Sequence, residues 1–180
     1  MTKVQTVREE GEPLESTLRR LEAMPDHLAA VAATMTADEI RWQPRVGEFS
    51  LLEHACHMRD LEREGYVVRI SRMLDENRPE LADFDGTRIA QERDYLAEEW
   101  DEALGAFRAT RTRNVETVSA LSTDALARTG VLEGVGELAI HQVVVAMAEH
   151  DAAHRAEIET LCELVRAKRS AGSGEDASPE

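Results

Sequence analysis

The amino-acid sequence predicts an all-α protein that is built from four long helices. Leu, Ala, Glu and Arg dominate over β-branched and aromatic residues, and apolar residues recur at helical spacing along most of the 180 residues. A hydrophobic content of 42% is sufficient for one domain with a sizeable core. We therefore expect a single bundle domain over residues 13–169, after a polar leader at residues 1–12. The short polar tail at residues 170–180 has nothing to bury, and we expect it to be disordered.

The first long helix is expected to begin at Pro13, because proline is favoured in the first helical turn, and to continue to Val31. Pro25 lies inside this stretch, and we expect it to kink or to interrupt the helix. Thr36 and Glu39 then form a capping-box pattern, in which each side chain accepts from a free backbone N–H of the other residue. This pattern predicts a short extra helix before the second long helix.

The remaining long helices follow from a second capping box and from apolar periodicity. Ser50 and Glu53 start the second long helix, which runs from Leu51 to about Leu74. The spacing of apolar residues predicts a third long helix from Thr87 to about Leu121. The connection that follows is predicted to be a loop because it contains three glycines, at Gly130, Gly134 and Gly136. The fourth long helix is expected from Ile140 to Val165.

The fourth helix carries two histidines on the face that should be buried. At about 100° per residue, His150 and His154 fall in one stripe with apolar residues. The apolar members of this stripe are Val143, Met147, Ile158, Leu161 and Val165. Imidazoles at positions i and i+4 have Cβ atoms roughly 6 Å apart, so both rings can reach one cation through bonds of about 2.0–2.1 Å. The alternative is a pair of core histidines that are satisfied by hydrogen bonds, and a third ligand would decide between the two interpretations.

His54 and His57 in the second helix are the two candidates for that third ligand. They lie about 60° apart around the helix axis, so spacing separates them only weakly. His57 shares its side of the helix with the carboxylates of Glu53, Asp60 and Glu64. These carboxylates either line a polar pocket or form a solvated face, and the residues alone leave both interpretations open.

The net charge of −15 makes nucleic acids and anionic membrane surfaces poor partners, because the sequence shows no basic stripe that would bind phosphate groups. No stretch has the length and hydrophobicity of a signal-peptide core or of a membrane span, so we expect a soluble cytoplasmic protein. Cys56 and Cys162 lie inside helical patterns, where a thiol packs as a small apolar group, and we expect no disulfide.

Three stretches of the sequence together carry a family pattern. The first comprises Trp42, Pro44 and Gly47, followed by FSLLEHACHMRDLE at residues 49–62. The others are Arg-Asp-Tyr at residues 93–95 and EHDAAHRAEI at residues 149–158. In this combination the sequence resembles the DinB superfamily, also described as DinB/YfiT-like metalloenzymes, and the resemblance covers residues 14–165.

The resemblance implies a four-helix bundle in which three histidines hold one divalent metal ion, zinc or nickel, at the end of a pocket between the helices. The family's ligand positions match His57, His150 and His154. Characterised members include low-molecular-weight thiol S-transferases and a mycothiol-dependent isomerase. The resemblance therefore implies a small-molecule substrate and, as one concrete function, the transfer of a small thiol to an electrophile. It leaves open whether the protein is a homodimer.

Two departures from the family pattern bear on the ligand environment. Ala153 stands where many members have a second histidine, and Glu157 stands where a glutamine is common. Glu157 lies about 20° from His150 around the helix, so it can add a carboxylate ligand or hold a ligand imidazole, and otherwise it pairs with an arginine. Asp60 can likewise orient the imidazole of His57 or merely solvate its helix. Beyond these two candidates, no catalytic residue is assigned.

The other histidines and the cysteines receive no site role. His27 and His141 match no ligand position of the family, and we expect both to be ordinary histidines. Cys56 lies about 100° from His57 around the helix, so packing is the expected role of its thiol. Three histidines leave at least one metal position open to water or substrate, which permits thiol activation or hydrolysis. A non-catalytic bundle that is stabilised by its metal is the further alternative.

Overall fold

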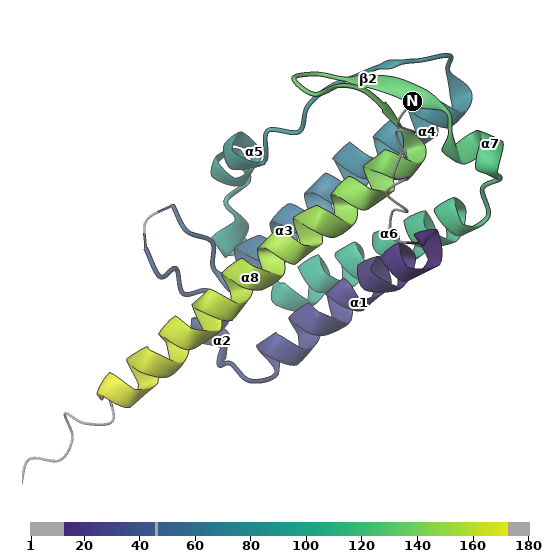
Figure 1. The fold of residues 1–180 in the computed structure, drawn as a ribbon. Coiled ribbons are helices and arrows are strands. Elements are labelled where there is room, and N and C mark those ends of the chain that lie inside the picture. Colours follow the sequence, from purple (N-terminus) through teal and green to yellow (C-terminus); the bar gives the residue numbers. More distant parts are fainter. Residues whose placement is uncertain (1–12, 46, 173–180) are drawn as a thin grey trace, which may run out of the picture.

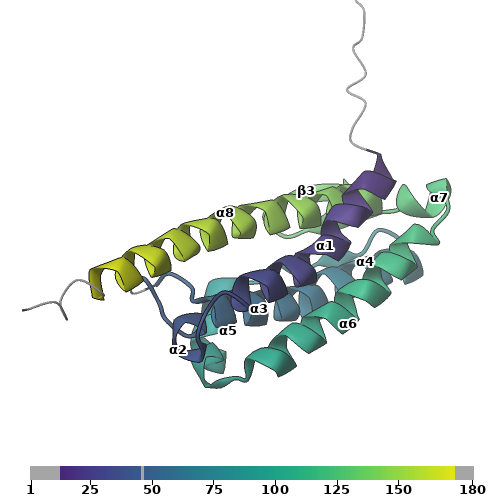
Figure 2. The same ribbon diagram turned by 90° about the horizontal axis from the view of Figure 1, so that it is seen from below.

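The computed structural model describes residues 13–45 and 47–172, so the leader and residues 173–180 lie outside the described part of the chain. Four long helical segments lie side by side and form a bundle (Figure 1, Figure 2). They are α1 (Leu14–Ala32), the continuous run at residues 51–75, α6 (Trp100–Ser119) and α8 (Ile140–Gly172). Helix α6 packs against α1 and against the start of the second segment, and α1 also packs against α8. The predicted four-helix bundle is therefore confirmed.

Helix α1 continues through Pro25, so the predicted interruption does not occur. Proline has no N–H group, which leaves the carbonyl of Leu21 without its helical donor. Arg111 of α6 replaces this donor, with 3.0 Å between its Nη1 and the Leu21 carbonyl oxygen. Arg111 is itself buried and also binds Asp151 of α8 at 2.6 Å. One buried guanidinium therefore links α1, α6 and α8.

The second long helix contains a π-helical segment that the sequence did not indicate. It runs as α3 (Leu51–Asp60), η1 (Leu61–Tyr66) and α4 (Val67–Asp75), and it starts at the expected capping box. Glu62 in the π segment is fully buried and accepts hydrogen bonds from Arg111 and Asn114, at 2.9 and 2.7 Å. Burial alone would lower the pKa of Arg111, but Glu62 and Asp151 raise it above its ordinary value. The π turn also shifts the helical register, so the faces of α4 do not follow from the periodicity of α3.

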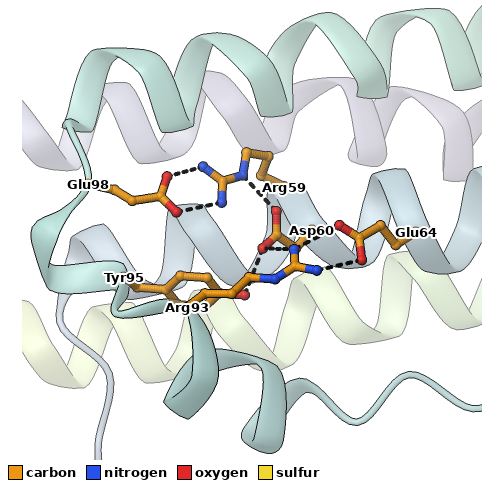
Figure 3. Close-up of polar contacts among 6 residues, drawn as sticks. All are labelled: Arg59, Asp60, Glu64, Arg93, Tyr95 and Glu98. Atoms are coloured by element: carbon orange, nitrogen blue, oxygen red, sulfur yellow. Dashed lines mark hydrogen bonds and ion pairs between the residues drawn. The ribbon is translucent and has the colours of Figure 1, made fainter.

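The predicted third helix from Thr87 to Leu121 is wrong at its beginning, where the chain forms three elements. These are α5 (Gly86–Arg93), η2 (Tyr95–Ala97) and α6. Asp94 lies between α5 and η2 in the left-handed conformation, with a φ of 45°, which aspartate tolerates better than most residues. The residues on either side, Arg93 and Tyr95, both donate to the buried carboxylate of Asp60 (Figure 3). A tertiary contact therefore breaks a stretch whose apolar spacing is helical throughout.

The predicted glycine loop is also wrong, because it forms part of a small sheet at the end of the bundle opposite α2 (Figure 1). After α7 (Thr123–Leu126), β2 (Thr129–Leu132) pairs antiparallel with β3 (Gly136–Ala139). Strand β1 (Glu80–Leu81) pairs parallel with β2. Gly134 and Gly136 have positive φ angles of 74° and 105°, and glycine adopts such angles without strain. Gly134 therefore lies in the turn of a hairpin and Gly136 begins its second strand, whereas Gly130 lies inside β2, and the fold remains predominantly helical.

The short helix α2 (Ala37–Ile40) confirms the first capping box. Glu39 also binds Arg169 of α8, with 2.7 Å between Oε1 and Nε. Arg169 donates in addition to the carbonyl oxygen of Thr34, at 2.8 Å. These contacts support the last turns of α8, so the prediction of disorder is wrong for residues 170–172; the rest of the tail lies outside the described residues.

Apolar side chains from all four helical segments fill the interior of the bundle. They include Leu28 of α1, Leu52 of α3, Phe107 of α6 and Ile158 of α8, all of which are fully buried. Within the described ranges, none of the helices has the length and hydrophobicity needed to cross a membrane. The core therefore positions α3 and α8, the two helices that carry the predicted ligands.

Candidate metal centre

Three histidine side chains from two helices converge where α3 contacts α8. His57 Nε2 lies 3.3 Å from His150 Nε2, and His154 Nε2 lies 3.1 Å from the same nitrogen. Nitrogen ligands bound at about 2.0–2.1 Å to a tetrahedral ion are roughly 3.3 Å apart. His150 therefore already has the spacing of a metal-binding set to each of the other two predicted ligands, and the ligand atoms of all three lie within 4.8 Å of one another. Their donor chemistry fits a divalent ion.

A pocket of about 770 Å³ gives access to these histidines. It lies between α3 and α8, and the loop before α3 and the first residues of α5 complete its wall. Its lining includes Phe49, Gly86, Thr87, Glu157 and Leu161 as well as the histidines. A cavity of this size accommodates a small-molecule substrate.

Burial keeps the histidines of this cluster in the neutral form. Burial, together with the neighbouring histidines, lowers the pKa of His150 and of His54 to about 3. Burial is also the main cause that lowers the pKa of His57 and of His154, each to about 4. A neutral imidazole has a lone pair for a metal ion, whereas an imidazolium has none. At neutral pH the cluster thus presents unprotonated nitrogen donors.

The ring of His57 is oriented by packing. The ring centroids of Phe49 and Phe84 lie 5.6 and 6.2 Å from that of His57. Gly86 lies so close that a Cβ atom at this position would be 2.4 Å from His57 Cε1. His57 Nδ1 is buried and has no hydrogen-bond partner within the described ranges of the chain. The sequence did not indicate these three neighbours of His57, because glycine and phenylalanine carry no signal of their own for a metal site.

His54 and Glu157 contact the other ring nitrogen of His154. His154 Nδ1 lies 2.9 Å from Glu157 Oε2 and 3.0 Å from His54 Nδ1. A carboxylate beside Nδ1 favours the proton on that nitrogen, which leaves Nε2 free to bind a metal. Of the roles expected for Glu157, this contact matches the holding of a ligand imidazole. His54 is outside the three-histidine set, as the family pattern implied, but it belongs to the same cluster.

Asp60 does not orient His57, so this part of the prediction is wrong. The Asp60 side chain is fully buried and accepts hydrogen bonds from Arg59 and Arg93, both at 2.7 Å, and from the Tyr95 hydroxyl at 2.9 Å (Figure 3). Burial alone would raise the pKa of Asp60, but the two arginines hold it below its ordinary value. Asp60 therefore fastens α5 and η2 to α3, and it reaches the metal centre only indirectly, through the position of Gly86.

The remaining histidines lie outside the cluster. His141 is exposed near the start of α8, where its Nδ1 lies 3.3 Å from the Leu126 carbonyl oxygen. His27 lies on α1, where burial lowers its pKa. Both cysteines are free thiols. Burial raises the pKa of Cys56 to about 12 and also raises that of Cys162, so neither thiol is a ready nucleophile at neutral pH.

The fold and the site together define a class of protein, a helical bundle with three clustered histidines that could hold a metal ion. The sequence pattern of the DinB superfamily matches residues 20–158. The chain belongs to the DinB superfamily, as the resemblance implied.

A solved structure supports the same conclusion about the fold. The chain is similar to YfiT from Bacillus subtilis, which is described as a probable metal-dependent hydrolase with an unusual four-helix bundle topology. The TM-score is 0.76 at 16% sequence identity, and the match covers 91% of this chain and 92% of YfiT. At this identity the comparison shows a shared fold. No curated protein matches the sequence.

Proposed function

We propose that this protein is a metal-dependent enzyme in which a small exogenous thiol attacks an electrophile. The observation that carries the proposal is the convergence of His57, His150 and His154 on one point beside a pocket of substrate size. Zinc and nickel are the proposed ions, because imidazole nitrogen is a suitable ligand for both. The open position of a three-histidine site is the place where a small thiol would bind.

A divalent ion held by the three histidines would favour the deprotonated form of a thiol in the pocket. The chain supplies the rest of the chemistry through position and charge. Gly86 and the two neighbouring phenylalanines fix the ring of His57. Glu157 lines the pocket with a side chain that is 60% exposed, so its carboxylate can accept the thiol proton and pass it to solvent.

The chain's own thiols do not suit the role of nucleophile. Neither Cys56 nor Cys162 is among the residues that line the described pocket. Cys56 is also fully buried, and its raised pKa keeps it protonated at neutral pH. An exogenous thiol is therefore the better nucleophile for a reaction at this site.

The test compares metal-loaded and metal-free protein in the conjugation of several cellular low-molecular-weight thiols to a chromogenic electrophile. We expect conjugation that depends on metal, persists after the double substitution Cys56→Ala and Cys162→Ala, and disappears in His150→Ala. Equal rates with and without metal would contradict the proposal. Metal-dependent thermal stability without any turnover would instead indicate a metal-stabilised binding bundle.

Hydrolysis is the second candidate, because YfiT, which shares the fold, is described as a probable metal-dependent hydrolase. Water at the same open position would replace the thiol as nucleophile. Ester and amide substrates, assayed with the same metal-loaded protein in the absence of thiol, distinguish the two candidates. Thiol-independent turnover that disappears in His150→Ala would favour hydrolysis.

A further inference from the structure

The two ring nitrogens of His154 face two different groups of potential metal ligands. Its Nε2 lies 3.1 Å from His150 Nε2, within the set that also includes His57. Its Nδ1 lies 3.0 Å from His54 Nδ1 and 2.9 Å from Glu157 Oε2. The last two atoms are 3.9 Å from each other. Two triads of potential metal ligands therefore share one ring.

We propose that His54, His154 and Glu157 bind a second divalent cation, so that the His154 ring bridges two metal ions. Two imidazole nitrogens and one carboxylate oxygen form a ligand set that zinc and similar transition metals accept. The second site goes beyond the proposed function, which requires only the ion at His57, His150 and His154. Glu157 would bind the second ion through Oε2, the oxygen beside His154 Nδ1, and its other carboxylate oxygen would remain to accept the thiol proton.

Hydrogen bonds satisfy the second triad less completely than a cation does. A neutral imidazole carries a single N–H, on one nitrogen or the other. When His154 carries it on Nδ1 and His54 carries its own on Nε2, the hydrogen of His154 is shared between the carboxylate of Glu157 and the lone pair of His54 Nδ1. A cation between the three residues accepts a lone pair from each of them, so that the ligand atoms no longer compete for one hydrogen.

Burial and charge favour a cation at this place. The His54 side chain is 3% exposed, and its Nδ1 lies 3.0 Å from His154 Nδ1, so it faces the proposed ion position from the interior of the protein. Glu157 is 60% exposed and lines the pocket, which gives an ion a route from solvent. The first triad has no carboxylate, and Glu157 adds a negative charge close to both positions.

The bridge requires that the second ion replace the Nδ1 proton of His154, which leaves to solvent. The ring then carries a negative charge between the two cations. This charge offsets part of the repulsion between them, which is strong at short distance in a partly buried site.

Metal content after loading with zinc, and separately with cobalt, tests the proposal on the full chain. We expect two equivalents per chain in the wild type and one in Glu157→Ala, which should fold normally because the side chain it removes is exposed. His150→Ala should retain one equivalent, held by the second triad. His154→Ala should lose both, because it removes the shared ligand. His141→Ala, an exposed histidine of the same helix, is the matched control and should retain two.

Each other outcome overturns a defined part of the scheme. One equivalent in the wild type that survives Glu157→Ala and is lost in His150→Ala overturns the second site and leaves the proposed function intact. One equivalent that is lost in Glu157→Ala and survives His150→Ala places the ion at the second triad alone. This result overturns both the two-metal bridge and the proposed function. In crystals of the zinc-loaded protein, anomalous scattering should show two peaks, one beside each nitrogen of His154, and a single peak overturns the bridge.

Discussion

Gly86 and His57 are in direct contact, although they belong to different helices. A Cβ atom at residue 86 would lie 2.4 Å from His57 Cε1 and 2.9 Å from His57 Nδ1, distances that no real side chain tolerates. Because His57 Nδ1 has no hydrogen-bond partner in the described part of the chain, this contact and the adjacent phenylalanine rings determine how the imidazole lies. A side chain at residue 86 would therefore displace the ring of His57, one of the three candidate ligands.

The substitution Gly86→Ala tests this requirement. We expect the added methyl group to displace the His57 ring and to lower metal affinity by about 10- to 100-fold, as the loss of an orienting contact does. Competition with a chromogenic chelator measures the affinity. Gly105→Ala is the control, because a Cβ at that exposed position in α6 meets nothing within 4 Å. It should leave affinity unchanged and raise the free energy of unfolding by about 0.5–1 kcal/mol. Unchanged affinity in Gly86→Ala would show that the ring has room to move.

His57→Ala should remove the ion that is bound jointly with His150. The variant loses one of three ligands, and the two imidazoles that remain form a weak site. We expect one equivalent of metal less than in the wild type, and no metal-dependent turnover, whereas His27→Ala and His141→Ala should match the wild type. If His57→Ala keeps its full metal content and turnover while His54→Ala loses both, the third ligand has been assigned to the wrong histidine of α3.

Affinity for duplex DNA should be negligible at physiological salt. A chain with a net charge of −15 repels the phosphate backbone unless a local basic surface releases counterions from it. A fluorescence titration with labelled duplex measures the interaction. Sub-micromolar binding with a steep salt dependence would contradict the prediction and would require a basic patch of exposed arginines, to which Arg59 and Arg69 do not contribute because both are buried and paired with carboxylates.

Acid should destabilise the metal-free protein. The pKa values of His57 and His154 are lowered to about 4 and that of His150 to about 3, from an ordinary value of 6.5. Above pH 6.5 these rings are neutral in both the folded and the unfolded chain. Between pH 6.5 and about 4 only the unfolded chain takes up the protons, so the free energy of unfolding falls with pH, by at most about 1.4 kcal/mol per unit for each histidine.

Urea denaturation in the presence of a chelator, from pH 8 to pH 5, measures this dependence. The free energy of unfolding should depend less steeply on pH in His150→Phe, because the unfolded variant takes up one proton fewer. This substitution keeps an apolar ring in place of the imidazole. Constant stability between pH 7 and pH 5 would mean that the rings titrate normally in the folded state.

The helices whose start is encoded locally could be predicted from the sequence. Ser50 and Glu53 define the beginning of α3 because a capping box involves only neighbouring residues. The break after α5 could not be predicted, because Asp94 turns where its neighbours reach Asp60, more than thirty residues earlier in the chain. The hairpin of β2 and β3 could not be predicted for a related reason, because β2 also pairs with β1, a strand that lies far earlier in the chain.

The residues of the candidate site likewise differ in whether the sequence could predict them. His150 and His154 could be predicted as a pair because both lie on one helix, where their spacing places them on one face. His57 required the family pattern, because residue spacing alone did not separate it from His54. The contact of Gly86 with His57 depends on where α5 lies against α3, and no local pattern encodes that position.

Asp60→Asn tests whether the buried carboxylate holds α5 in place. The substitution keeps the shape of the side chain but removes the charge that Arg59 and Arg93 share (Figure 3). We expect the free energy of unfolding to fall by about 3 kcal/mol, as for a broken buried ion pair. Metal affinity should fall with it, because a displaced α5 withdraws Gly86 from the metal centre. Glu92→Gln, which breaks an exposed pair on α5, is the control and should change stability by less than about 1 kcal/mol. An Asp60→Asn variant that keeps the stability and the metal affinity of the wild type would show that α5 is held by its apolar contacts alone.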